Sequence, residues 1–392
     1  MECVQRSGVA VRWARATMFI AVAPLMQCGE TQFGAGSGDG GGVAPSPEAS
    51  VHETGAHEAA AHDASTDAAD ASVRFAMPTV VARGQPQPKG IAVDTNYLYW
   101  VDAESASGGA GSVQAMKKGT TTPAQIASGQ VAPLDLVLDD TTLFWSVNTG
   151  GTAPAGAQCL AMRLNKLLID GTQCVTGGPL STTRLTITTD ALVLIGQPGG
   201  GANVNPILVV TAKAAASTNK NSPLQGPSVA VGASSSSAFV GNSHGPHIDT
   251  YPLAPPFTPA DPGLCGAQDC AGTGATAGAS IIQDIAVASD SKVFWVVSNG
   301  AVLALSAAAA GEMPTTLGMV PGAPQRIALD GSYVYVTSAT GSATGAISAV
   351  PIAGGEVQTL ANPDCAPFGI AVDTLNVYWT CSDGTVRAVG IP

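Results

Sequence analysis

Short apolar runs, each broken by a polar turn, recur along the chain from about residue 79 to its end. Two of them are almost identical, since residues 90–100 read GIAVDTNYLYW and residues 369–379 read GIAVDTLNVYW. The runs are apolar on both faces and too short for helices, which predicts pairs of buried strands. An aspartate between two strands can begin a tight turn through its own side chain. We expect this role for Asp94, Asp139, Asp190, Asp330 and Asp373.

Five further copies of the run lie between these two, at residues 134–145, 185–195, 228–240, 285–295 and 327–336. A third apolar run and often a fourth follow each copy, so the repeat holds four strands. The repeat spans 45 residues from Ile91 to Leu136, 42 from Ile285 to Ile327 and 43 from Ile327 to Ile370. Four strands at this period are typical of a β-propeller blade.

The number of blades depends on the middle of the chain. The 149 residues from Leu136 to Ile285 would hold three blades and an insertion, or two very long blades. Residues 254–278, which are rich in Gly, Ala and Pro, suit the insertion. We therefore predict an all-β, seven-bladed β-propeller, with six blades as the alternative.

The last repeat is one strand short. Its three strands are expected at residues 368–372, 377–380 and 385–389, and the sequence then ends at Pro392. The run TVVA at residues 79–82, just before the first full repeat, has the character of a fourth strand. It can complete the last blade and remove the exposed sheet edges of an open ring. We predict that this N-terminal strand closes the propeller, which then spans residues 79–392.

Part of the repeat resembles known propellers. Tyr99, Trp100, Val101 and Asp102 read YWVD and resemble the YWTD signature of one propeller class. The repeat as a whole is similar to that of secreted NHL-like propellers. The resemblance implies the propeller architecture, but it does not extend to a receptor function. The last copy, YWTC at residues 378–381, lacks the aspartate, and YWTD propellers have six blades.

The N-terminus predicts export. Three arginines precede the apolar run ATMFIAVAPLM at residues 16–26, which is too short to span a bilayer and matches the core of a secretory signal. Residues 25–28, LMQC, resemble the lipobox of bacterial lipoproteins, although Gln27 stands where a small residue is usual. This resemblance implies lipidation of Cys28. Ordinary signal cleavage and a retained N-terminal anchor are the alternatives.

Residues 29–78 contain hardly any apolar side chains and are predicted to be a flexible, disordered tether. The chain thus divides into a signal segment (1–28), a linker (29–78) and the propeller (79–392). We expect an exported monomer in the bacterial cell envelope, anchored to the outer membrane by lipid alone.

The charge of the chain restricts its possible partners. The net charge is −12 and the propeller has no cluster of Lys or Arg, which excludes a nucleic-acid backbone as a partner.

Six cysteines remain in the exported part, where disulfides are the norm. Their places in the repeat predict the pairs Cys159–Cys174, Cys265–Cys270 and Cys365–Cys381. A zinc site is the rival interpretation, but the sequence has no CxxC pair.

A polar residue begins the loop between the second and third strands in several repeats. These residues are Asp102, Asn148, Asn242, Asn299 and Asp383. Their oxygens could form a ligand rim for a hard cation such as Ca²⁺, with His244 as a general base. That would fit a metal-dependent lactonase-like or lyase-like propeller. Asn and Asp also simply begin turns. We therefore expect a non-enzymatic module without a cofactor that binds a protein or glycan at the cell surface. The metal-dependent enzyme is the alternative.

Overall fold

The computed structural model describes residues 76–104, 110–148, 159–166, 172–177, 180–198, 206–213, 220–224, 228–242, 247–254, 264–265, 270, 281–307 and 312–392. Cys28, His244 and the predicted linker up to residue 75 lie outside these residues. The part that is described contains no α-helix, and no helix there is long and apolar enough to cross a membrane.

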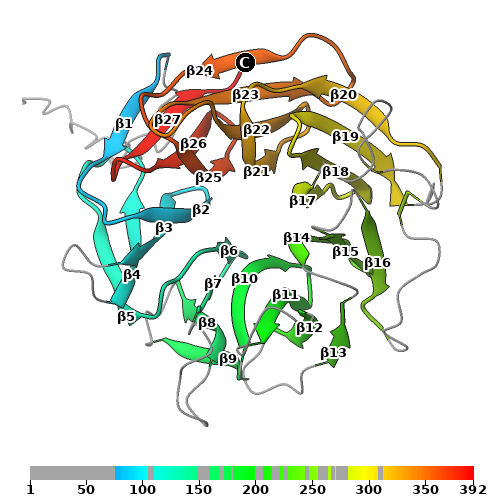
Figure 1. Cartoon of the computed structure of the whole chain (residues 1–392). Coiled ribbons are helices and arrows are strands. Elements are labelled where there is room, and N and C mark those ends of the chain that lie inside the picture. The colour runs from blue at the N-terminus through cyan, green and yellow to red at the C-terminus, as the bar shows by residue number, and fades with distance from the viewer. Residues whose placement is uncertain are drawn as a thin grey trace, which may run out of the picture. The chain divides into compact units, whose positions relative to one another are not determined.

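The strands form seven antiparallel sheets, which are the blades of the propeller (Figure 1). Blade 1 has β2 (Pro88–Val93), β3 (Tyr97–Glu104), β4 (Ala110–Lys117) and β5 (Ala124–Gln130), and blade 2 has β6 (Leu136–Leu138), β7 (Thr142–Ser146), β8 (Cys159–Asn165) and β9 (Gln173–Gly177). Blade 3 has β10 (Leu180–Ile187), β11 (Ala191–Pro198), β12 (Ile207–Ala212) and β13 (Lys220–Pro223), and blade 4 has β14 (Ser228–Ala233), β15 (Ser237–Asn242) and β16 (Ile248–Pro252). Blade 5 has β17 (Ile282–Val287), β18 (Lys292–Val297), β19 (Ala301–Ser306) and β20 (Thr315–Met319), and blade 6 has β21 (Ala323–Leu329), β22 (Tyr333–Ala339), β23 (Gly345–Pro351) and β24 (Gln358–Ala361). Blade 7 has β25 (Pro367–Val372), β26 (Asn376–Cys381), β27 (Val386–Gly390) and β1 (Thr79–Ala82).

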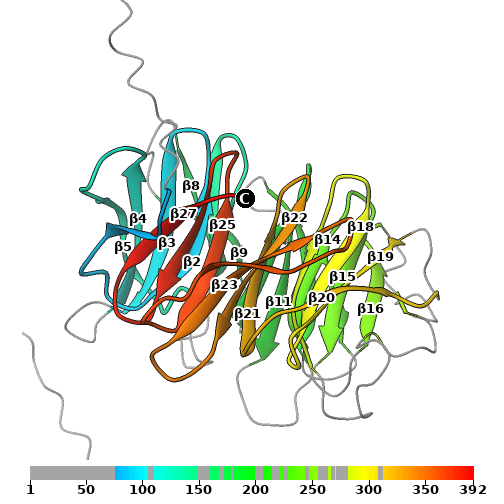
Figure 2. The same cartoon turned by 90° about the horizontal axis from the view of Figure 1, so that it is seen from above.

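The innermost strands of the seven blades form a ring. Each contacts the first strand of the next blade, in the order β2, β6, β10, β14, β17, β21, β25 and back to β2. Figure 2 shows the blades side by side in the view at right angles to Figure 1. The predicted fold class and the count of seven blades are confirmed. The predicted insertion at 254–278 lies between β16 and β17, mostly outside the described residues.

The two ends of the propeller meet in blade 7. Strand β1 pairs antiparallel with β27, with Thr79 opposite Ala388, Val80 opposite Arg387 and Ala82 opposite Val386. The side chain of Ala82 is buried in a cluster that includes Val386 and Ala388.

The two near-identical GIAVD segments lie mainly in β2 and β25, which are neighbours in this ring. A Cβ on Gly369 would come within 2.3 Å of the carbonyl oxygen of Lys89, and a Cβ on Gly90 within 2.7 Å of the nitrogen of Leu136. Glycine therefore permits the close approach of adjacent inner strands at both positions. The repeated glycine is a packing requirement of the inner ring.

Turn aspartates occupy the end of the first strand in four blades. In each case Oδ1 accepts backbone N–H groups two and three residues later, at Asp94, Asp139, Asp330 and Asp373. The prediction for Asp190 is wrong. In that turn Thr188 holds the equivalent place, and its hydroxyl accepts the N–H groups of Asp190 and Ala191. The Thr188 hydroxyl, two residues before Asp190, thus accepts the backbone hydrogen bonds that an aspartate accepts in the other turns.

Ion pairs join neighbouring blades at these turns. The lysine that follows the third strand of one blade reaches the turn aspartate of the preceding blade. The pairs are Lys118–Asp373 at 2.6 Å, Lys166–Asp94 at 2.9 Å and Lys213–Asp139 at 2.8 Å. Burial alone would raise the pKa of Asp373, but the hydrogen bonds from Lys118 and from backbone N–H groups hold it below its usual value. The pairs therefore link blades 7, 1, 2 and 3 in sequence.

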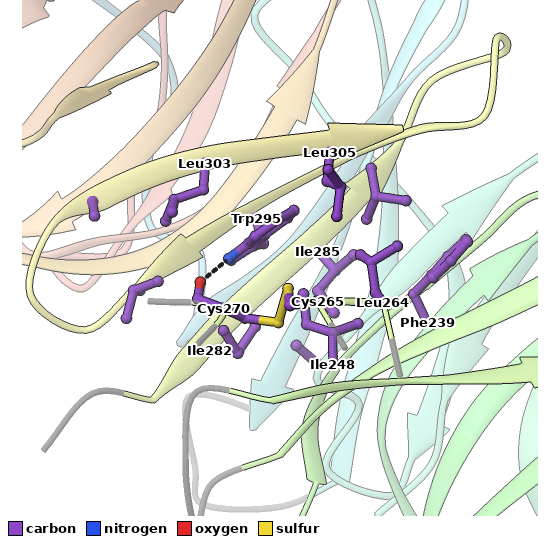
Figure 3. Packing of buried hydrophobic residues seen from close by; sticks show 14 residues of the cluster. Phe239, Ile248, Leu264, Cys265, Cys270, Ile282, Ile285, Trp295, Leu303 and Leu305 are labelled. Carbon is purple, nitrogen blue, oxygen red and sulfur yellow. Dashed lines mark hydrogen bonds between the residues drawn. A yellow bond between two sulfur atoms is a disulfide. The ribbon is translucent and has the colours of Figure 1, made fainter. Parts of the chain in front are cut away.

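A buried tryptophan marks the second strand in four blades: Trp100, Trp145, Trp295 and Trp379. In three of them the indole N–H bonds to the segment that enters the blade. Trp100 donates to Gln85 at 3.1 Å, Trp145 to Gln130 at 2.8 Å, and Trp295 to the carbonyl of Cys270 at 2.7 Å. Figure 3 shows this last bond beside the Cys265–Cys270 disulfide, inside the core shared by blades 4 and 5.

All three predicted disulfides are present. Cys159–Cys174 joins β8 to β9, Cys265–Cys270 lies within the insertion, and Cys365–Cys381 joins the loop before β25 to the end of β26. The Cα atoms in each pair lie 5.6 to 5.7 Å apart. Three disulfides fit a protein that folds in an oxidising, extracellular environment.

Candidate functional site

The ring of inner strands encloses a cavity of about 480 Å³ on the propeller axis. Residues from the first strand of every blade, or immediately before it, line this cavity. Apolar residues of those strands, such as Ile91, Leu136, Ile285 and Ile370, are among its lining residues, but polar atoms form the larger part of the surface that faces the cavity. A cavity of this volume is in the range of small-molecule sites.

Charged residues gather where the inner strands begin, on the face that carries the loops between blades. We call this group the charged mouth, and it consists of Lys89, Asp135, Arg184, Asp284 and Arg326. All except Lys89 line the cavity. Four of them occupy the same place in the repeat, one residue before Leu136, Leu185, Ile285 and Ile327 of the inner strands. The other blades have Gly90, Ala230 and Gly369 at that place.

The two carboxylates of the charged mouth hold the backbone of the following blade. Oδ2 of Asp135 accepts the N–H of Leu185 at 3.1 Å, and Oδ2 of Asp284 accepts the N–H of Ile327 at 2.9 Å. Both bonds therefore link blade to blade, from 2 to 3 and from 5 to 6. Arg184 precedes Leu185 and Arg326 precedes Ile327, so the same hydrogen bonds also fix the backbone next to each arginine.

Arg326 reaches across the mouth between these carboxylates. Its Nη2 is 3.8 Å from Oδ1 of Asp135 and its Nη1 is 4.0 Å from Oδ1 of Asp284. Both distances exceed hydrogen-bond range. The guanidinium carbon lies 4.9 Å from the ring centre of Phe368, and the Lys89 ammonium lies at the same distance from that ring. Arg326 is therefore held by charge and by an aromatic ring.

The guanidinium groups retain unused donors. The side chain of Arg326 is only 6% exposed, yet neither Nη1 nor Nη2 has a hydrogen-bond partner among the described residues. Nε of Arg184 is likewise buried without one, although its Nη1 donates to the carbonyl of Thr183. An unmade hydrogen bond from a buried charged group is costly. Groups of this kind are candidates for ligand contact.

Burial shifts the protonation of the charged mouth. It lowers the pKa of Arg184 to about 10, assisted by the nearby charge of Arg326. It also lowers the pKa of Lys89, again with Arg326 as the second cause. Burial raises the pKa of Asp284, while Arg326 and Arg184 oppose that rise. Three cations and two carboxylates form the charged mouth, and the carboxylate of Glu104, outside this group, favours the charged form of Lys89.

Asp102, the first residue of the predicted rim, lies at the end of β3 with no exposed surface. Its Oδ2 accepts a long hydrogen bond of 3.4 Å from the Ser112 hydroxyl, and its Oδ1 has no partner among the described residues. Burial raises the pKa of Asp102 to about 7, partly offset by hydrogen bonds from Gln114 and Ser112. Asp102 is thus an interior carboxyl group of blade 1.

The other rim residues lie at the ends of strands. Oδ1 of Asn299 accepts the N–H of Ala301 at 2.9 Å, and Oδ1 of Asp383 accepts the N–H of Thr385 at 3.0 Å. Both oxygens therefore stabilise tight turns. Asn148 and Asn242 are described, His244 is not, and none of the described rim residues lines the central cavity.

Within the described ranges, one group of metal-ligating residues lies close together. It consists of Cys365, Cys381 and Asp383. The two sulfurs form a disulfide, and Oδ2 of Asp383 accepts a hydrogen bond from Arg387 at 2.6 Å. A disulfide sulfur is a poor substitute for a thiolate ligand. This group is better suited to structure than to metal binding.

The charged mouth is the site that reading the sequence missed. The signal is present in the aligned repeats, where the residue at this position is Gly, Asp, Arg, Ala, Asp, Arg and Gly in blade order. A search for residues that the repeats share does not find this position, because the repeats differ there. Charge at a position that faces the axis is the useful signal.

No protein-family model and no curated protein sequence matches the chain. Solved structures share its fold. Virginiamycin B lyase from Staphylococcus aureus has a TM-score of 0.58 at 10% identity, with 81% of this chain and 99% of that chain covered. A chain of the mitotic checkpoint complex has a TM-score of 0.57 at 9% identity, covering 83% and 98%. The computationally designed protein Ika8 has a TM-score of 0.52 at 15% identity, covering 80% and 99%. At these identities the likeness is one of fold, and propellers with very different roles share it.

Proposed function

We propose that this chain is an exported binding module, whose ligand enters the central cavity at the charged mouth. One observation carries the proposal: a buried arginine presents both terminal nitrogens of its guanidinium, without hydrogen-bond partners among the described residues, beside a cavity of about 480 Å³. A ligand that accepts those hydrogen bonds would relieve the cost of burying them. The rigid ring around the site favours recognition over large movement.

The rival is a metal-dependent hydrolase or lyase that uses the predicted rim and His244. One of the solved structures with this fold is a lyase, which gives that rival some weight by analogy. Against it, Asn299 and Asp383 already use side-chain oxygens in turns, and Asp102 has no exposed surface. A cation would have to compete with those internal bonds. The binding module therefore has the better support.

Thermal melts of the full chain distinguish the two functions, because a ligand that binds only the folded state raises the melting temperature. We expect millimolar Ca²⁺, compared with a chelator, to leave the melting temperature unchanged within about one degree. Small acids, amines and neutral sugars are then tested as probes. At least one probe should raise the melting temperature of the wild type and not of Arg326→Lys. A rise of several degrees with Ca²⁺ that disappears in Asn299→Ala would favour the enzyme instead.

Tethering is the other half of the proposal. The lipobox-like residues 25–28 and the low-complexity linker would hold the propeller clear of a membrane, with Cys28 carrying the lipid. A linker of about fifty residues has a root-mean-square reach of roughly 40 Å if flexible. In cells, labelled palmitate should enter the wild-type protein but not Cys28→Ala. Equal labelling of both proteins, or of neither, would point to a plainly secreted protein.

A further inference from the structure

The geometry of Arg326 specifies what its ligand must offer. Two terminal nitrogens of one planar guanidinium are free side by side, and such a fork matches two oxygens of one acceptor group. Asp135 and Asp284 do not fill this role, because their Oδ1 atoms lie 3.8 and 4.0 Å away and their Oδ2 atoms accept backbone N–H groups. The Phe368 ring beneath the guanidinium fixes its plane. The edge of the guanidinium that carries Nη1 and Nη2 thus has a set orientation before a ligand binds.

Charge selects among the possible acceptors. Neither Asp135 nor Asp284 is within hydrogen-bond range of the Arg326 guanidinium, so an anionic acceptor would form charge-assisted hydrogen bonds that are stronger than those of a neutral one. A phosphate dianion would bring two negative charges next to the same two aspartates. A single carboxylate brings only one.

The size of the cavity limits what the carboxylate is attached to. A volume of about 480 Å³ lies toward the lower end of the range for small-molecule sites, which suits a short molecule. The lining residues include Leu136, Leu185 and Ile327, against which a short aliphatic stem can bury apolar surface. The unpaired Nε of Arg184 supplies a further donor at the same mouth. A short acid therefore fits better than a nucleotide.

We propose that the charged mouth binds the carboxylate of a short aliphatic acid, either free or as a group on a partner peptide. Two parallel hydrogen bonds from Arg326 hold the carboxylate, and Arg184 assists. This inference rests on the proposed function, since it names the ligand class of the same site. It reaches further in excluding neutral molecules and phosphate as the main ligand.

Calorimetric titration of the full chain at low ionic strength tests the ligand class. The probe is the monocarboxylate butyrate, and its matched control is the uncharged amide butyramide. Inorganic phosphate is titrated in parallel. We expect butyrate to bind the wild type at least tenfold more tightly than either control. Hydrogen bonds between charged groups differ from neutral ones by about that much.

Variants locate the binding. Arg326→Lys keeps the charge and loses the fork, so butyrate should bind it roughly tenfold more weakly or worse. Arg83→Gln removes one positive charge from an exposed position outside the site and should leave the affinity within about twofold. Arg326→Gln is added if it melts cooperatively, and Arg326→Lys suffices if it does not. Equal affinity in wild type and Arg326→Lys would overturn the proposal.

Further arms separate the two sources of the carboxylate. An acetylated and amidated peptide with one Glu presents a side-chain carboxylate, and an otherwise identical peptide without Glu but with a free C-terminus presents a terminal one. Tighter binding of either peptide than of butyrate assigns the site to a partner protein. If butyrate, both peptides and acetate all fail to bind, the inference is wrong. If butyramide or a neutral sugar binds and depends on Arg326 while butyrate does not, the inference fails but the binding function stands.

Discussion

Deleting residues 78–83 should lower the free energy of unfolding by about 4 kcal/mol or more and lower the melting temperature by ten degrees or more. The deletion removes β1, the strand that pairs with β27 in blade 7. Lost ladder hydrogen bonds contribute about 1 kcal/mol each, and the lost burial around Ala82 adds to them. The exposed edge of β27 would also be free to pair with other chains. Urea unfolding and thermal melts measure the effect.

The control is a deletion of six residues within the linker, such as residues 60–65, which should leave the melting temperature unchanged. If the chain without residues 78–83 melts like the intact protein, the N-terminal strand does not support the ring. Aggregation of the truncated chain, with the control remaining monomeric, would agree with an opened edge at β27.

Replacing Asp102 with Asn should stabilise the protein, and the gain should grow with pH. Burial raises the pKa of Asp102 to about 7, whereas the pKa in an unfolded chain is about 3.9. Between these values the folded chain keeps a proton that the unfolded chain has released, so this residue makes stability fall as the pH rises. The amide in Asp102→Asn does not titrate. Each pKa unit corresponds to about 1.4 kcal/mol, so the gain approaches at most about 4 kcal/mol above pH 7.

Urea unfolding at pH 4, 5.5, 7 and 8.5 measures the difference between the two proteins. It should be small at pH 4, rise through pH 5.5 to 7 and then level off. Asp140→Asn changes an exposed aspartate and serves as the control, with a difference that stays near zero at every pH. A difference for Asp102→Asn that is constant or shrinks with rising pH would mean that Asp102 is ionised in the folded protein throughout.

Most of the fold was predictable because each blade contains its own local signals. The alternation of inner strand, turn and second strand recurs in every repeat, and Cys159 and Cys174 flank one local hairpin. The fourth strand of blade 7 could be predicted because TVVA at β1 has the character of a strand. The role given to Asp190 was wrong, because a threonine two residues earlier can begin the same turn. Sequence spacing does not distinguish these two local bonds.

The site was much less predictable, because it is assembled across the ring. Arg326 in blade 6 faces Asp135 in blade 2, although 191 residues separate them in the sequence. Nothing local to either residue indicates that encounter, which depends on seven blades closing around one axis. The rim residues were chosen from a local loop pattern, and a local pattern fits turn formation equally well, as Asn299 and Asp383 illustrate. Residues that converge on an axis are found by aligning the repeats and asking which position faces inward.

The most direct measurement of the central claim is a crystal structure of the chain with butyrate. We predict a carboxylate in the charged mouth, with its two oxygens within hydrogen-bond distance of Nη1 and Nη2 of Arg326 and the aliphatic stem in the central cavity. Asp135 and Asp284 should keep their bonds to Leu185 and Ile327, because those bonds hold neighbouring blades. Butyrate bound elsewhere, or an Arg326 that bonds directly to Asp135 and Asp284 while the mouth holds only water, would contradict the proposed site.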